Sequence, residues 1–218
     1  MDLIDKPAIA RSLFVYALLY GGMTVIAGVL GFKQVALGPL AVESGIFAFL
    51  VLVILSSAVA ELHGREIANK LVLWGFLPLL SSMALIALVL QLPAAQTMPA
   101  DWLAAFDKVL SQNLRIMAAG PLAYGVSQML NVAIFSRLRG AGDGGSLWLM
   151  IRGGIASALS QVVDTLIFIT VAFWGEFPIA PLLAGQMMAK VVLSLVLVPF
   201  LIQFAVALGR HLDRRIFL

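Results

Sequence analysis

The stretch Phe47-Ala-Phe-Leu-Val-Leu-Val-Ile-Leu55 contains only apolar side chains and decides the fold class of this chain. A strand of a membrane β-barrel would alternate apolar and polar side chains with a period of two, whereas a buried or lipid-facing helix needs no alternation. The stretch Val191–Phe200 also fails to alternate. We therefore interpret both as parts of membrane-spanning helices and expect an all-α integral membrane protein.

The composition of the whole chain supports a membrane protein. Of its 218 residues, 62% are apolar and 11% are charged, and the mean hydropathy is +1.05. A soluble domain carries about 25% charged residues, so this chain has too little polar surface to cover a water-soluble globule. This excludes a soluble enzyme and a nucleic-acid-binding domain. The chain has no cysteine, which excludes disulfides and thiolate metal sites.

Six apolar segments are long enough to cross the hydrocarbon core of a bilayer, which takes about 20 residues. We expect one transmembrane domain over residues 1–218 with the spans Ser12–Gly31, Leu40–Val59, Leu71–Leu90, Ile116–Ser136, Trp148–Trp174 and Ile179–Leu208. The longest loop, Gln91–Arg115, contains the segment Asp101–Phe106. We interpret that segment as a short connecting helix at the membrane interface, or as a lid over a pocket.

The basic residues predict the orientation of these spans. One side of the six-span topology carries Lys6, Arg11, Arg65, Lys70, Arg137, Arg139, Arg210, Arg214 and Arg215. The other side carries Lys33 and Lys108. Because cytoplasmic loops of membrane proteins are enriched in Lys and Arg, we expect a multi-pass protein of the cell membrane with both termini in the cytoplasm.

Two of the expected spans share a sequence pattern. Ser127–Phe135 and Ser160–Phe168 both read S-Q-x-x-[N/D]-x-x-I-F. Steps of three and four residues place side chains on one helix face. They give one stripe of Tyr124, Gln128, Asn131 and Phe135 and a second of Ser157, Gln161, Asp164 and Phe168. Polar groups are costly against lipid, so we expect both stripes to face each other inside the bundle and form a polar pocket with aromatic walls.

Each polar residue also has a structural interpretation. Ser, Gln and Asn often hold transmembrane helices together. A carboxylate at mid-membrane depth, such as Asp164, marks a ligand or ion site by default; the alternative is a structural ion pair with Arg152 or Lys190. Lys33 can reach toward the pocket or lie at the interface.

The chain carries no catalytic motif. The patterns H-E-x-x-H, G-x-S-x-G and Walker A are absent, and both histidines fall outside the expected spans. We therefore expect no enzyme, no ATP hydrolysis by this chain, no metal site and no cofactor.

The segments Ala123–Leu138, Leu147–Arg152 and Ser157–Phe168 resemble the queuosine precursor transporters, also called the vitamin uptake transporter family. The pattern S-x-x-S-Q-x-x-D-T-x-I-F of Ser157–Phe168 is the specific part of this resemblance. Ala60–Lys70, which includes Glu61, is similar to the family's turn after the second helix, and Lys33 matches a lysine that closes the first. The chain departs from the family at Ser57, His63 and Asn131, where the family commonly has Asp, Tyr and Asp.

The resemblance implies a six-helix fold like the substrate-binding subunits of energy-coupling-factor transporters, and 7-deazaguanines as substrates. In such a pocket Asp164 would accept the two adjacent N–H groups of the heterocycle. The amides of Gln128, Gln161 and Asn131 would meet O6 and the ring nitrogens, and the rings of Tyr124, Phe135 and Phe168 would stack on the ligand. Ser157, Lys33 and Glu61 complete the candidate binding residues.

Three functions remain open at this point. The chain could transport its substrate alone or as a homo-oligomer. It could instead be the substrate-binding subunit of an ATP-driven transporter, docking on an energising module through small residues of its first helix, which otherwise serve ordinary helix packing. Those residues are Ala17, Gly21, Gly22, Ala27 and Gly28. A membrane enzyme or a scaffold is the third alternative, and the absent catalytic motifs argue against the enzyme.

Overall fold

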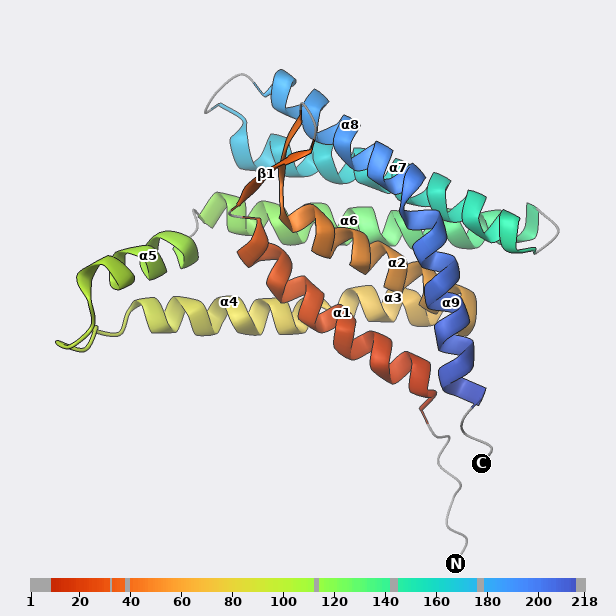
Figure 1. Ribbon diagram of the computed structural model, residues 1–218, viewed down its shortest axis with the longest axis horizontal. Helices are drawn as coiled ribbons and strands as arrows, with labels where there is room; N and C mark the ends of the chain where they lie inside the picture. The colour runs from red at the N-terminus through yellow and green to blue at the C-terminus, as the bar shows by residue number, and fades with distance from the viewer. Residues whose placement is uncertain are drawn as a thin grey trace, which may run out of the picture.

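The computed structural model describes residues 9–31, 33–37, 40–111, 114–141, 145–175 and 179–214, and these form a bundle of long helices (Figure 1). The elements are α1 (Arg11–Leu30), β1 (Gln34–Leu37), β2 (Leu40–Glu43), α2 (Gly45–His63), α3 (Arg65–Trp74), α4 (Phe76–Leu90), α5 (Ala100–Leu110), α6 (Leu114–Arg137), a 3-10 turn η1 (Leu138–Ala141), α7 (Ser146–Phe173), α8 (Ala180–Val196) and α9 (Val198–Arg214). Helices satisfy their backbone hydrogen bonds internally, as a bilayer requires.

The bundle has two ends that differ in their contents. At one end, which we call the terminal end, the first turn of α1 meets the last turn of α9. The Ser12 N–H and hydroxyl donate to the two carboxylate oxygens of Asp213 at 2.9 and 2.7 Å. His63, the last residue of α2, shares a 2.8 Å hydrogen bond with the Ser12 hydroxyl. The opposite end, the hairpin end, carries the antiparallel β1–β2 hairpin between α1 and α2.

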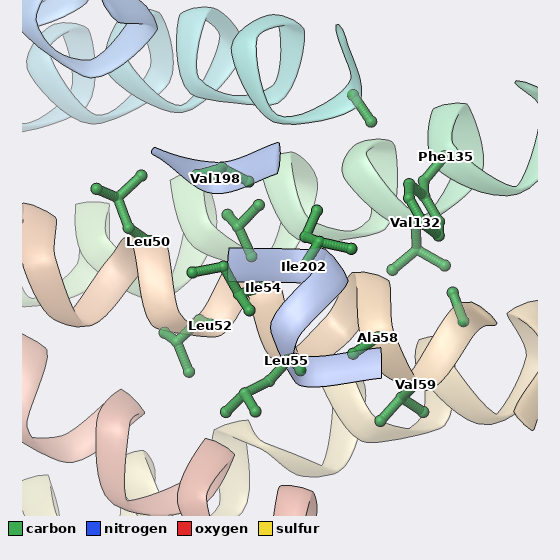
Figure 2. Packing of buried hydrophobic residues seen from close by; sticks show 14 of the residues in the cluster. Leu50, Leu52, Ile54, Leu55, Ala58, Val59, Val132, Phe135, Val198 and Ile202 are labelled. Atoms are coloured by element: carbon green, nitrogen blue, oxygen red, sulfur yellow. The ribbon is translucent and has the colours of Figure 1, made fainter. Parts of the chain in front are cut away.

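Helix α2 is the central helix of the bundle. In its most apolar window 72% of the residues are buried, against 17% for α1 and 11% for the span made by α3 and α4. A helix that is apolar on every face is stable only inside a bundle or in lipid. Figure 2 shows the side chains that gather around it, among them Leu50, Ile54, Ala58 and Val59 of α2, Val132 and Phe135 of α6, and Val198 and Ile202 of α9.

The structure contains four to five candidate membrane spans in the described residues. Arg11–Leu30, Gly45–His63, Arg65–Leu90 and Ser146–Phe173 are each long and apolar enough, and α8 with α9 supplies a fifth if that bent pair is one span. Helix α6 has 24 residues but is not among them. The chain is therefore an all-α membrane protein, with one short hairpin as its described β-structure.

Three expected spans differ from the observed helices. Leu40–Glu43 is a strand, so α2 starts only at Gly45. The sequence signal for this interruption of the expected span is the Gly38-Pro39 pair, because Gly-Pro pairs are typical of breaks in regular structure. The third span begins at Arg65 and divides into α3 and α4, and the sixth bends by 46° between α8 and α9. Pro78 follows the break between α3 and α4, and Pro199 follows the break between α8 and α9. A proline interrupts a helix because it has no N–H to donate to the carbonyl four residues earlier.

Two further expectations concern the long loop and the basic residues. A helix does occupy the long loop, as α5. Lys6 and Arg215, two of the basic residues that predict the orientation, lie outside the described residues.

The break between α3 and α4 generates a stability prediction. A Cβ atom at Gly75 would lie 2.5 Å from Cε1 of Tyr20, whose ring is fully buried, whereas a Cβ at Gly22 would have no neighbour within 4 Å. Overpacking of this kind costs about 1–3 kcal/mol. We expect Gly75→Ala to lower the thermal unfolding temperature of the detergent-solubilised protein, and Gly22→Ala to leave it unchanged or raise it. Equal unfolding temperatures would contradict this packing.

Candidate binding cavity

A cavity of about 450 Å³ lies in the half of the bundle next to the hairpin end, which we call the hairpin half. Its wall consists of the later turns of α1 and α7, the first turns of α2, the middle of α4, the C-terminal end of α5, residues 120–124 of α6 and one face of α8. Binding pockets for small molecules commonly have volumes of about 300–1,000 Å³. The cavity is therefore large enough for a small ligand, and it collects side chains that are distant in the sequence.

Two charged residues, Asp164 of α7 and Lys190 of α8, stand in the described part of this wall. The Lys190 ammonium lies 2.8 Å from Oδ2 of Asp164, and the Ser127 hydroxyl of α6 donates to Oδ1 at 3.2 Å. Asp164 is 4% exposed and Lys190 7%. A charge this deeply buried requires a partner, and the two charges together leave the wall electrically neutral.

Aromatic rings flank this ion pair. The Phe49 ring of α2 packs edge-on against Tyr124 of α6, with ring centroids 5.8 Å apart. The Lys190 ammonium lies 5.4 Å from the centre of the Phe49 ring. Phe168 and Phe173 of α7 form a second edge-to-face pair at 6.1 Å. All four rings line the cavity, so its wall combines flat apolar surfaces with one pair of opposite charges.

The cavity contains three of the candidate binding residues, Asp164, Tyr124 and Phe168. The pairing that the sequence left open is with Lys190. Both stripes are interior, since every member is buried except Phe168, which is half-buried. The contact between Ser127 and Asp164 places α6 and α7 side by side, as Figure 1 also shows.

The remaining polar members of the α6 stripe face α2 rather than the cavity. Gln128 accepts a hydrogen bond from Ser56 at 3.1 Å. Asn131 donates to Ser57 at 3.0 Å and to Ser56 at 3.3 Å. Small serines on α2 let α6 approach closely and provide polar partners. These amides thus join α6 to α2.

Three other candidates also lie outside the described cavity lining. Ser157 and Gln161 of α7 are fully buried, and within the described residues neither amide atom of Gln161 has a hydrogen-bond partner. Lys33 is exposed between α1 and β1, where its carbonyl accepts the Ser44 N–H at 2.8 Å.

Glu61 and Phe135 belong to a separate cluster at the terminal end. Glu61 at the end of α2 forms an ion pair with Arg152 in the early turns of α7, and Arg139 approaches the same carboxylate at 3.8 Å. The Arg152 guanidinium carbon lies 4.2 Å above the centre of the Phe135 ring. Arg152 is therefore paired with Glu61 at this end, and Lys190 is the cation that contacts Asp164.

Sequence reasoning missed Lys190 and Gln186 as cavity residues. They line the wall four residues apart on α8. A lysine and a glutamine at this helical spacing within an otherwise apolar segment were the available signal. In the described residues, no group of three or more His, Asp or Glu side chains could hold a metal ion.

Comparison with known proteins identifies the family. The model described as "Putative vitamin uptake transporter" matches residues 43–204, a range that includes the Asp164–Lys190 pair and the Glu61–Arg152 cluster. The chain belongs to the vitamin uptake transporter family. A curated relative in Bacillus subtilis (strain 168), the "Probable queuosine precursor transporter", is 30% identical over 189 residues, which cover 86% of this chain and 76% of the relative. No solved structure matches this chain.

The family confirms a transporter rather than an enzyme. Its members are named for the uptake of small molecules, which agrees with a cavity inside an apolar bundle.

The terminal-end cluster generates a stability prediction. Removing one partner of a buried ion pair leaves an uncompensated charge and costs about 3–5 kcal/mol. We therefore expect Arg152→Met to destabilise the solubilised protein strongly, and the double change Glu61→Gln with Arg152→Met to restore much of the loss. Thermal unfolding of both single variants and the double variant measures this coupling.

The exposed pair Glu66–Lys70, whose ammonium and carboxylate lie 2.8 Å apart, provides the control. Exposed pairs contribute little, so Lys70→Met should leave the unfolding temperature unchanged. If Arg152→Met were as mild as Lys70→Met, the ion pair with Glu61 would not be a stabilising contact.

Proposed function

We propose that this chain carries a queuosine precursor across the cell membrane, and that the precursor binds in the cavity of the hairpin half. The substrate class is a 7-deazaguanine, such as 7-cyano-7-deazaguanine or 7-aminomethyl-7-deazaguanine. The observation that carries the proposal is the buried Asp164 carboxylate in a cavity wall with aromatic rings. The name of the Bacillus subtilis relative supports the same substrate class.

The chemistry of Asp164 suits one edge of a deazaguanine. That edge presents two neighbouring donors, the N1–H and the 2-amino group. An ionised carboxylate has two oxygens and about four acceptor positions, of which the described contacts with Ser127 and Lys190 use two. The remaining positions can accept both ligand donors as charge-assisted hydrogen bonds. These bonds are stronger in a desolvated cavity than in water.

The rings of the cavity suit the faces of the same ligand. A flat heterocycle gains about 1–3 kcal/mol for each base–aromatic stack. Phe49 and Tyr124 lie on the α2 and α6 wall, and Phe168 lies on α7, beyond Asp164 by four residues. A heterocycle hydrogen-bonded to Asp164 is therefore within a helical turn of an aromatic face.

Asp164→Asn tests the proposal. The amide keeps the size of the side chain but offers one acceptor oxygen, so the second ligand donor meets an NH₂ group. A lost charge-assisted hydrogen bond costs about 1.5–3 kcal/mol, and we expect affinity for 7-cyano-7-deazaguanine to fall roughly ten- to a hundredfold. Isothermal titration calorimetry of purified full-length protein measures it.

Asp107→Asn is the matched control, because Asp107 is an exposed aspartate on α5, outside the described cavity lining. It should bind like the unaltered chain. Wild-type affinity in Asp164→Asn would remove Asp164 from the binding site, and no binding of any deazaguanine by the unaltered chain would contradict the proposed substrate class.

We also propose six membrane crossings with both termini in the cytoplasm of a cell-membrane protein. The contact between Ser12 and Asp213 supports an even number of crossings, because it brings the two ends of the helical bundle together. Helix α6, the fourth crossing in chain order, would bring the number of spans to six, with its polar residues shielded by α2 and α7.

Cysteine labelling checks this topology on the natural cysteine-free background. Ala104 of α5 and His211 of α9 are both exposed. We expect Ala104→Cys to react with a membrane-impermeant maleimide in intact cells, and His211→Cys to react only after the membrane is opened. The reverse pattern would contradict the orientation.

A substrate-binding subunit of an ATP-driven transporter is the alternative. One observation favours it: Ala17, Gly21 and Gly22 of α1 line a shallow apolar groove beside Pro78 of α4, where another helix could approach closely. Uptake of 7-cyano-7-deazaguanine by the purified chain alone in proteoliposomes would support an independent transporter. Binding without uptake would favour the subunit.

A further inference from the structure

We propose that Lys190 reads the 6-oxo group of the ligand, so that Asp164 and Lys190 together select a guanine-type edge and reject an adenine-type edge. This inference rests on the proposed function, because it assigns a specificity role within the same cavity. It adds a residue, from a helix that carries neither polar stripe.

The geometry of the ion pair provides the first argument. The Lys190 ammonium and the Asp164 carboxylate lie 2.8 Å apart on one wall of the cavity. The wall therefore presents a hydrogen-bond donor directly beside an acceptor. A guanine-type edge presents the complementary order, with the 6-oxo acceptor beside the N1–H donor and the 2-amino donor after it. One pair of charges can thus engage all three groups of the ligand.

The remaining bonding capacity of Lys190 provides the second argument. An ammonium has three N–H donors, and among the described residues the contact with Asp164 uses one. A second side of the ammonium faces the Phe49 ring, whose centre is 5.4 Å away. Lys190 is only 7% exposed, so a ligand oxygen that takes up the free donor replaces no strong contact with bulk water. The bond forms in a desolvated site and is charge-assisted.

The same arrangement rejects an adenine-type edge. That edge has an amino group at position 6 and an unprotonated N1. The amino donor would face the Lys190 ammonium, and the N1 lone pair would face the Asp164 carboxylate. Both contacts are repulsive, and they leave buried charges without ligand partners. A site built to hydrogen-bond a polar group discriminates strongly against analogues that lack it.

The experiment measures a ratio of two affinities on the same protein sample. The ligands are 7-deazaguanine and 2-amino-7-deazapurine, which lacks both the oxygen at position 6 and the N1–H, and 7-deazaadenine serves as the adenine-type probe. We expect the unaltered full-length chain to prefer 7-deazaguanine over 2-amino-7-deazapurine roughly ten- to a hundredfold, and to bind 7-deazaadenine more weakly still.

Lys190→Met should lower the ratio of the two affinities severalfold, because the oxygen loses its donor, and the preference that is left reflects the contact of the N1–H with Asp164. Lys190→Gln keeps a neutral donor and should retain part of the preference. Lys70→Met removes an exposed lysine of α3 outside the described cavity lining, so it should keep the full ratio. Because each ratio is taken on one sample, partial loss of folded protein does not change it. Lys190→Met leaves the Asp164 carboxylate buried without its cation, and combining it with Asp164→Asn removes that unpaired charge.

The outcomes separate this inference from the proposed function. An undiminished ratio in Lys190→Met, in a chain that still binds 7-deazaguanine, would overturn the role of Lys190 and leave the proposed function intact. A ratio near one in the unaltered chain would overturn it without any variant. If the unaltered chain bound none of the three ligands, both proposals would fail.

Discussion

The packing of the hairpin half depends on the ion pair between Asp164 and Lys190. Two opposite charges lie inside an apolar bundle, and each would be strongly unfavourable alone. Their 2.8 Å contact joins α7 to α8, and the hydrogen bond from Ser127 adds α6. The wall that results carries its two charges at one point and is mostly apolar elsewhere. A ligand that satisfies the same two charges can enter without leaving either one unpaired.

The two halves of the bundle hold different features. The hairpin half holds the cavity. The terminal half holds two groups of polar contacts that cross between helices, one around Glu61 and Arg152 and one around Ser12 and Asp213. Apolar residues of α2, α6 and α9 pack between them (Figure 2). In this conformation a ligand in the cavity has packed side chains and ion pairs between it and the terminal end.

The sequence predicts the long helices well because their cause is local. An apolar stretch bounded by charges and breakers identifies a span by itself, and the burial of both stripes follows from the cost of polar groups in lipid. The division of α8 from α9 was accessible only through Pro199, and the hairpin only through Gly38-Pro39. These signals are common outside helix breaks and hairpins, so they carry less information than the apolar stretches.

The candidate site was predictable only in part, because helical spacing gives the face of a helix but not its neighbour. Gln128 and Asn131 share a stripe with Tyr124, yet they meet the serines of α2, while Tyr124 reaches the cavity one turn earlier. For the same reason, the sequence left open whether Arg152 or Lys190 is the partner of Asp164. Position along the span decides it, since Arg152 lies at the opposite end of α7, beside Glu61.

The contact of α1 with α9 has a consequence for the order in which the protein assembles. Ser12 and Asp213 are separated by 201 positions, and the Tyr16 hydroxyl donates to the Ala205 carbonyl across 189. Helix α1 leaves the ribosome before α9, so these two contacts form only after α9 has been synthesised. Closing so long a loop is entropically expensive and slow. Helix α1 can therefore pack against α2 early, as the Ser12–His63 hydrogen bond shows, and the arrival of α9 adds the contacts with Asp213 and Ala205 in a later step.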